Sequence, residues 1–385
     1  MAVDHPIIII GSGLAGYNVA REFRKLNSDA ELIIVADDDA NFYSKPLLSN
    51  ALVKNKTAQE LAMSDAEKMA DDLNAQVLKN TRVEKIEPEN NVIHIGDDKT
   101  LNYSQLVLAM GASTIELSIS GNAADKIVSV NDLESYAVFR KAIADKKRVA
   151  IIGAGLIGCE FANDLVLSDY DVSVIGLSEQ PLNNLLPQQA GEYLKTALTE
   201  QGVNWHLGKE TKQINFVENA FKIDFADGTA LEVDVVLSAV GLNPNIQVAN
   251  EAGIAVNKGI VVNKQLETNE KNIYALGDCA EIESLFLPYV MPLMTSARAL
   301  AKSLNGDVTP VSFPAMPVMV KTPSCAVVVS PPARGIDGEW KIEQDEEGVR
   351  ARFIDQAGVL KGYALVGKAV EDKQALTKEL PAVLS

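Results

Sequence analysis

Short apolar runs that end at a glycine recur along the chain. The stretch PIIIIGSGLAGYNVA (6–20) contains four consecutive isoleucines, then three glycines, then residues that can continue as a helix. This pattern predicts a strand, a tight turn and a helix. A second apolar run, ELIIVADD (31–38), follows at the distance expected for the next strand of the same unit.

The three glycines of this first stretch suit a dinucleotide site. Gly11 permits the turn, Gly13 lets a pyrophosphate approach the backbone, and Gly16 lets the helix pack closely on the strand. Free amides at the helix start can then hold the phosphates. Asp37, at the end of the second run, is the expected ribose ligand; Asp38 is the alternative, and a merely solvated acid is the other interpretation.

The same order of elements occurs a second time. RVAIIGAGLIGCEFA (148–162) carries Gly153, Gly155 and Gly158, and the apolar run DVSVIGL (171–177) follows it. In both copies the next segments read as short strands joined by hairpin-like turns, and they lead to a further apolar run. The sequence therefore predicts an α/β fold with two Rossmann-like dinucleotide-binding domains.

Length, composition and charge narrow the class of protein. The chain has 385 residues, which is more than one core usually organises, and its 47% hydrophobic and 23% charged residues are typical of a globular protein. A formal net charge of −17 makes nucleic acid an improbable partner. No apolar run reaches the roughly 18 residues of a membrane span, and the first residues do not resemble a signal sequence, so a soluble cytoplasmic protein without membrane contact is expected.

The cysteines and histidines give no indication of a metal site. Cys159, Cys279 and Cys325 are too far apart for a C-x-x-C pair, and the three histidines are isolated. These cysteines suit a reducing compartment, and we expect Cys159 and Cys279 to be buried as small hydrophobic residues.

A third motif, TNEKNIYALGDCA (268–280), ends an apolar run at Gly277 and Asp278 and precedes a helical run at 291–304. With the two glycine-rich stretches in this order, the chain resembles the flavoprotein reductases built on the glutathione-reductase plan. The resemblance implies that the first cradle holds FAD, that the second holds the nicotinamide nucleotide, and that Asp278 binds the flavin ribitol. It also implies a discontinuous FAD domain (1–112 and 243–312), an NAD domain (113–242) and a small C-terminal α+β domain (313–385).

The redox partner is suggested by a segment that lacks cysteine. Disulfide reductases of this superfamily carry a cysteine pair, but NFYSKPLLSNALVKNK (41–56) has none. Its YSKPLLS (43–49) is similar to a signature of reductases that serve small iron proteins. Further likeness at 156–165, 289–294 and 320–332 is closest to the bacterial rubredoxin reductases. The resemblance implies transfer of electrons from NADH through FAD singly to rubredoxin; the alternatives are a ferredoxin reductase of an oxygenase system and a redox-responsive flavin- and NAD-binding protein.

The resemblance also implies a set of cofactor contacts and no catalytic side chain, because hydride transfer needs orientation more than acid–base chemistry. The FAD contacts are Gly11, Gly13, Gly16, Asp37, Lys45, Pro46, Val83, Ala109, Gly111, Gly277, Asp278 and Lys321. The NAD contacts are Gly153, Gly155, Leu156, Ile157, Gly158, Glu160, Glu179 and Gly241.

Three of these positions need comment. Lys321 is the expected cation beside the flavin, although an exposed strand lysine is its default interpretation. Glu160 is expected in the first turn of a helix, where the helix dipole favours an acid in any case. Leu156 is at the position where glutathione-reductase relatives have a tyrosine that covers the flavin. The resemblance therefore implies that this chain has no such tyrosine over the flavin.

NADH is favoured over NADPH because IGLSEQ (175–180) offers no Arg or Lys to a 2′-phosphate, and Glu179 would repel one. The usual acid position is Gly176, so Glu179 has to reach from further along.

Two expectations concern how the carrier docks and how the C-terminal residues fold. Rubredoxins are typically acidic, so a local basic patch is expected to steer them; its candidate members are Lys45, Lys54, Lys56 and Lys321. The last residues predict a small sheet with a final helix at 369–380. The oligomeric state is left as monomer or homodimer.

Overall fold

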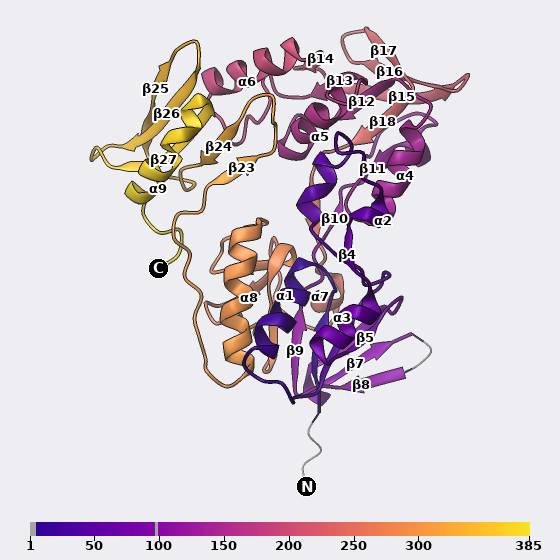
Figure 1. Cartoon of the computed structure of the whole chain (residues 1–385), viewed down its shortest axis with the longest axis vertical. Coiled ribbons are helices and arrows are strands. Elements are labelled where there is room, and N and C mark those ends of the chain that lie inside the picture. Colours follow the sequence, from indigo (N-terminus) through magenta and orange to yellow (C-terminus); the bar gives the residue numbers. More distant parts are fainter. Residues whose placement is uncertain (1–4, 97–98) are drawn as a thin grey trace.

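A computed structural model describes residues 5–96 and 99–385. The first body, in the lower half of Figure 1, is built on a parallel five-stranded sheet in the order β21-β9-β1-β2-β5. Helix α1 (Leu14–Arg24) follows β1, and α8 (Val290–Leu304) packs beside α1. The five strands are β1 (Ile7–Ile10), β2 (Leu32–Val35), β5 (Gln76–Leu78), β9 (Gln105–Leu108) and β21 (Ile273–Ala275).

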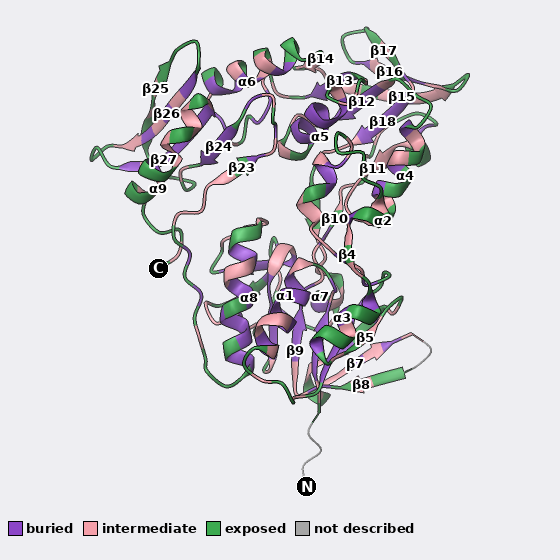
Figure 2. Cartoon of the chain, in the orientation of Figure 1, coloured by how far each residue is buried: buried purple, intermediate pink, exposed green. Residues whose placement is uncertain are grey.

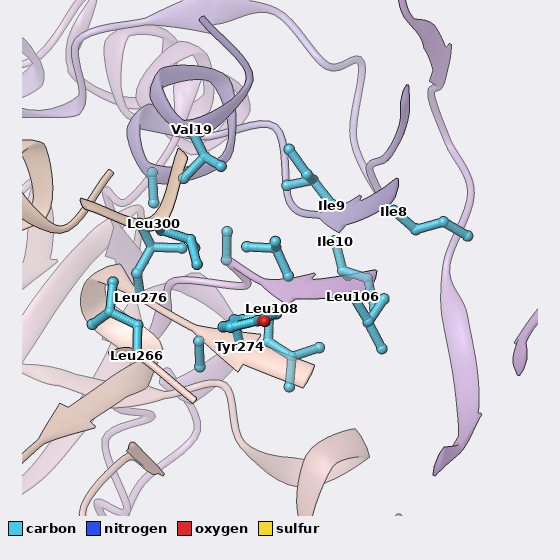
Figure 3. Packing of buried hydrophobic residues seen from close by; sticks show 14 of the residues in the cluster. Ile8, Ile9, Ile10, Val19, Leu106, Leu108, Leu266, Tyr274, Leu276 and Leu300 are labelled. Carbon is cyan, nitrogen blue, oxygen red and sulfur yellow. The ribbon is translucent and has the colours of Figure 1, made fainter. Parts of the chain in front are cut away.

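Two of the three interior strands of this sheet are buried along their whole length. Every residue of β1 and β2 is buried, as expected for a parallel sheet covered on both faces. Figure 3 shows Val19 of α1 and Leu300 of α8 directed toward the sheet, near Ile9 and Leu108. The run of isoleucines therefore forms the centre of the first core, seen as the buried interior of the lower body in Figure 2.

A second parallel sheet has the order β11-β18-β12-β13-β14. Its strands are β11 (Val128–Ser129), β12 (Arg148–Ile152), β13 (Asp171–Gly176), β14 (Val203–Leu207) and β18 (Val235–Ser238), and its helices are α4 (Leu133–Ile143), α5 (Leu156–Val166) and α6 (Gln188–Glu200). The two bodies are joined by an antiparallel ribbon of β10 (Ala112–Thr114) and β19 (Leu242–Pro244). Two of the predicted domain boundaries, 112/113 and 242/243, fall in this ribbon, and the division into domains stays a prediction.

Not all of the strands predicted to be joined by hairpin-like turns belong to hairpins. In each copy the leading strand, β5 or β14, pairs in parallel with the main sheet and forms its edge. Only the strands after it make three-stranded antiparallel sheets. These are β6 (Val83–Glu87), β7 (Val92–Ile95) and β8 (Lys99–Asn102) in the first body, and β15 (Thr211–Val217), β16 (Ala220–Phe225) and β17 (Ala230–Val233) in the second.

The predicted C-terminal sheet is confirmed as a five-stranded sheet in the order β23-β24-β27-β26-β25. Its strands are β23 (Val318–Val320), β24 (Val327–Ser330), β25 (Gly338–Gln344), β26 (Gly348–Asp355) and β27 (Leu360–Gly367), and all its pairings are antiparallel. The final helix is shorter than predicted, because 368–372 forms a 3-10 turn before α9 (Lys373–Glu379) begins.

One core joins the C-terminal sheet to the second body. Val327 and Val349 of the sheet belong to the same buried cluster as Leu194 of α6 and Val174 of β13. Leu48, from the first body's chain, lies in that cluster too. The upper half of Figure 1 is therefore packed from three separate stretches of sequence.

Short elements complete the described part of the chain. These are β3 (Phe42–Tyr43), the 3-10 helix η1 (Lys45–Asn50), α2 (Ala58–Leu61), β4 (Ala62–Ser64), α3 (Ala66–Leu73), η2 (Pro88–Asn90), η3 (Ala124–Lys126), α7 (Gln247–Glu251), β20 (Ile260–Val262), η4 (Gly277–Cys279) and β22 (Ala280–Ile282). Among residues 5–96 and 99–385, no helix is both long and apolar enough to cross a bilayer.

Candidate dinucleotide and electron-transfer site

Several of the predicted FAD contacts meet at one edge of the first sheet. Gly11, Asp37, Ala109 and Gly277 lie just beyond the ends of β1, β2, β9 and β21, and parallel strands end at the same edge. Val83 is the first residue of β6. The chain just before it is bonded to the residue that follows β2, because Thr81 N donates a hydrogen bond to Ala36 O at 2.7 Å. Gly111 follows Ala109 on the chain, and its carbonyl accepts from Asn245 N.

The glycines differ in the space around them, as a pyrophosphate cradle requires. A Cβ placed on Gly16 would lie 1.9 Å from the carbonyl oxygen of Gly11, and one on Gly158 would lie 1.9 Å from that of Gly153. A Cβ on Gly13 or Gly155, in contrast, meets no other atom within 4 Å. The third glycines are thus needed for helix packing, while the second ones leave open space at a helix N-terminus, which fits a phosphate-bearing ligand at both cradles.

The two acids after β2 have different surroundings. Asp38 accepts hydrogen bonds from Ser12 Oγ (3.1 Å) and from Ala40 N (2.9 Å), so its carboxylate holds the loop beside the first glycine turn. Asp37 is exposed. This division favours Asp37 as the acid available to a ribose, and that role stays a prediction.

Charged groups surround the start of η1, where Pro46 follows Lys45. Burial lowers the pKa of the Lys45 ammonium, while the carboxylates of Asp278 and Asp132 act in the opposite direction. Burial also raises the pKa of Asp278, against the effect of Lys45. Asp132, the N-cap of α4, was not predicted, because its position between the two glycine repeats carries no motif.

The second cradle repeats this geometry at the edge of the second sheet. Gly153 follows β12, Gly241 lies just beyond β18, and α5 carries Leu156, Ile157, Gly158 and Glu160. Leu156 is half-buried and Ile157 is exposed at the start of the helix. Glu179, three residues beyond β13, rests its carboxylate against Gly208.

A buried carboxylate joins three parts of the chain. Glu160 of α5 has a side-chain exposure of 1%, and it forms an ion pair with the ammonium of Lys321. Its oxygens also accept from Lys321 N (2.9 Å) and from Ser49 Oγ (2.5 Å), and Lys321 Nζ lies 3.1 Å from Ser49 Oγ. We call Ser49, Glu160 and Lys321 the junction cluster.

The junction cluster corrects two expectations. Glu160 lies in the second turn of α5, fully buried, so attraction by the helix dipole does not explain it. Lys321 is paired with Glu160, and Lys45 lies among carboxylates, so neither ammonium is free to form a steering patch with Lys54 and Lys56. A role for Lys321 as the cation beside the flavin stays a prediction.

Neighbouring polar contacts hold the same segments together. Asp164, one turn beyond Glu160, accepts from Leu52 N (2.9 Å) and Val53 N (3.0 Å). Asn163 Nδ2 donates to Ser324 Oγ at 2.9 Å. Helix α5 therefore holds both the segment after η1 and the C-terminal sheet, and no local pattern in the sequence indicates these pairs.

All three cysteines are buried, which confirms the expectation for Cys159 and Cys279. Burial raises the pKa of Cys159 and of Cys279 to about 12, and that of Cys325 to about 11. Since the thiolate is the reactive form, these thiols are unsuited to a disulfide relay.

We therefore expect the native protein to react with no equivalent of a thiol reagent such as DTNB at pH 8 within minutes, and with three equivalents after unfolding. With a pKa near 11, about one thiol in a thousand is ionised at that pH. Alkylating reagents should leave NADH oxidation unchanged. A gain of DTNB-reactive thiols when the protein is reduced with NADH would contradict this expectation.

Comparison with known proteins agrees with this arrangement. A family profile described as pyridine nucleotide-disulphide oxidoreductase matches residues 5–301, and one described as rubredoxin binding C-terminal domain matches residues 310–380. The chain is 47% identical over 381 residues to a rubredoxin-NAD(+) reductase of Alcanivorax borkumensis (99% of this chain, 100% of that protein). It is 45% identical over 388 residues to one of Acinetobacter baylyi (99% of each).

A solved ferredoxin reductase from Rhodopseudomonas palustris is also similar, with a TM-score of 0.88 and 26% identity over 98% of this chain and 96% of that chain. An NADH:rubredoxin oxidoreductase from Clostridium acetobutylicum gives a TM-score of 0.82 at 20% identity, over 98% and 95% of the two chains, which supports the fold alone.

Proposed function

Because the chain belongs to the pyridine nucleotide-disulphide oxidoreductase family, we propose that it is an NADH-dependent FAD enzyme that delivers electrons singly to rubredoxin. The observation that carries this proposal is the pair of open glycine cradles combined with cysteines that are all buried. Two dinucleotides fit the chain, and its thiols are unsuited to accept electrons between them and a carrier.

Each cradle has a separate task in this proposal. The amides after Gly11 and Gly13, with Asp278 at the same sheet edge, hold FAD. The amides after Gly153 and Gly155 hold NADH and set its orientation. Bound FAD supplies the chemistry of accepting a hydride and releasing single electrons.

The chain's own polar groups position the site and control its charge. Glu160 forms an ion pair with the ammonium of Lys321 at the point where η1, α5 and β23 approach one another, so the position of this lysine is set by a buried carboxylate. The carboxylates of Asp278 and Asp132 favour the charged form of Lys45 at the start of η1, against the effect of burial on its pKa.

The direct test is anaerobic reduction of the purified yellow protein with NADH, followed by addition of rubredoxin or of a [2Fe–2S] ferredoxin. We expect fast bleaching of the flavin absorbance and reoxidation by rubredoxin at a rate at least tenfold above that with ferredoxin. Faster reoxidation by ferredoxin would select the alternative supported by the fold of the Rhodopseudomonas enzyme. Slow reoxidation by both would indicate a redox-responsive binding protein, and a colourless protein would refute the proposal.

The cytoplasm is the proposed location. Unpaired cysteines are typical of proteins kept in a reducing compartment, and Cys159, Cys279 and Cys325 are all free.

Charge is distributed unevenly, and one segment suits an acidic carrier. Besides Lys321, which is paired with Glu160, residues 284–336 contain Arg298, Lys302 and Arg334 but a single acid, Asp307, in a chain with a net charge of −17. Arg298 and Lys302 are exposed, one turn apart, on α8. This face of α8 is therefore suited to steer rubredoxin.

We expect the double charge reversal Arg298→Glu/Lys302→Glu to lower kcat/KM for rubredoxin by at least about tenfold at low ionic strength, since steering is electrostatic. The difference should shrink at high salt, and turnover with an uncharged quinone as acceptor should be unchanged. The matched control is Lys146→Glu/Lys212→Glu, which makes the same change in charge at exposed positions of the second body. Equal losses in both variants would mean that net charge, not this face, determines the rate.

A further inference from the structure

We propose that Asp227, in the turn between β16 and β17, determines the preference for NADH over NADPH by holding the ammonium of Lys209 away from the nucleotide. The inference rests on the proposed function, because it concerns the cradle formed by Gly153, Gly155 and Gly158. It adds a residue that lies on a different hairpin from the loop where nucleotide specificity is usually determined.

The relevant loop follows β13. In dinucleotide-binding folds the ribose is recognised about 20 residues beyond the third glycine, at the end of the second strand. Here that place is occupied by Gly176, Leu177 and Ser178. Gly176 is buried and has no side chain to offer, so the discrimination must come from neighbouring residues.

The turn after β14 is bonded directly to this loop. Lys209 N donates to Gly176 O and Gly208 N donates to Ser178 O, both at 3.1 Å. The carboxylate of Glu179 lies against the same turn, because a Cβ on Gly208 would be 2.5 Å from Glu179 Oε1. Lys209 is thus fixed by its backbone beside the position where a 2′-phosphate would arrive.

Lys209 nevertheless directs its charge elsewhere. Its ammonium pairs with Asp227 Oδ2 (2.9 Å) and donates to Thr229 Oγ1 (2.8 Å), and it lies 5.1 Å from the ring centre of Phe225. Asp227 is itself held by Thr229, whose N and Oγ1 donate to Asp227 Oδ1 at 2.9 and 2.6 Å. The cation is therefore attached to the β16–β17 hairpin.

This attachment is easily reversed. The Lys209 and Asp227 side chains are 29% and 48% exposed, and exposed ion pairs contribute little free energy. A 2′-phosphate carries nearly two negative charges and accepts charge-assisted hydrogen bonds. Once Asp227 loses its charge, a phosphate becomes the stronger partner for Lys209, whereas NADH offers nothing to attract it.

The test is the variant Asp227→Asn, which removes the charge and keeps an oxygen to accept from Thr229. We expect the ratio of kcat/KM for NADPH to that for NADH, with ferricyanide as acceptor, to rise at least about fivefold, with the NADH value within twofold of wild type. Affinity for 2′,5′-ADP should rise by a similar factor, and affinity for 5′-ADP should not. Asp227→Glu should behave as wild type, and Lys209→Ala/Asp227→Asn should abolish the gain.

The outcomes separate this inference from the function on which it rests. If wild type oxidises NADH and Asp227→Asn changes neither the NADPH ratio nor 2′,5′-ADP affinity, the role of Asp227 is refuted alone. If the gain persists in Lys209→Ala/Asp227→Asn, repulsion by Asp227 itself replaces our explanation. If wild type binds neither NADH nor 5′-ADP, the proposed function fails and this inference fails with it.

Discussion

Gly155→Val should remove reduction by NADH while leaving the protein yellow. A Cβ at Gly155 meets no other atom within 4 Å, so the substitution fits the fold, but the new side chain occupies the space above the N-terminus of α5 that a pyrophosphate would need. We expect kcat/KM for NADH to fall by at least about 100-fold, which corresponds to about 2.8 kcal/mol. The measurement is stopped-flow bleaching of the flavin absorbance under anaerobic conditions.

Two matched variants control this experiment. Gly13→Val places the same side chain in the first cradle, so it should lower FAD content and yield a pale protein. Reduction of Gly155→Val by dithionite should match wild type, because it does not require the nucleotide cradle. Reduction of Gly155→Val by NADH at the wild-type rate would mean that the second cradle does not bind the nucleotide.

Lys321→Met should destabilise the folded protein by about 3–5 kcal/mol, because it leaves Glu160 buried without its counter-ion. The substitution keeps a flexible apolar chain of similar length, so little packing is lost. The expected result is a lower urea midpoint in circular dichroism, measured with FAD in excess. Flavin fluorescence followed in the same titration shows whether the cofactor is released in the same step.

The companion variant Glu160→Gln/Lys321→Met isolates the buried charge. A glutamine can still accept from the backbone N of residue 321 through its Oε1 and can donate from its Nε2 to Ser49 Oγ, and neither contact depends on the lysine side chain. We expect it to recover more than half of the lost stability, while Lys54→Met, at an exposed position, should stay within about 0.5 kcal/mol of wild type. A single Lys321→Met variant as stable as wild type would show that the junction cluster does not contribute to stability.

The elements that the sequence predicts well are those determined locally. The strands before Gly11 and Gly153, the tight turns and the helices after them depend on residues within about 15 positions of one another, and all of them are present. The C-terminal strands were predictable for the same reason. The family and the class of reaction followed from the resemblance that the three motifs and their order carry, and the family is confirmed by the comparisons.

Contacts between distant segments were not predictable. Glu160 and Lys321 are 161 residues apart in the sequence. Asp132 affects the pKa of Lys45 only because the fold brings its charge near that lysine. The assignment of β5 and β14 to the parallel sheets depends on which strand edge is free, which periodicity does not report. Each of these errors concerned a partner in space, while the type of local structure was right.

The core shared by the C-terminal sheet, α6 and the segment around Leu48 limits how this protein can be re-engineered. A chimaera that exchanged only residues 313–385 with another reductase would set Val327, Val349 and their neighbours against a foreign helix. A graft intended to change carrier choice should therefore transplant the sheet together with its apolar counterparts on α6 and around Leu48.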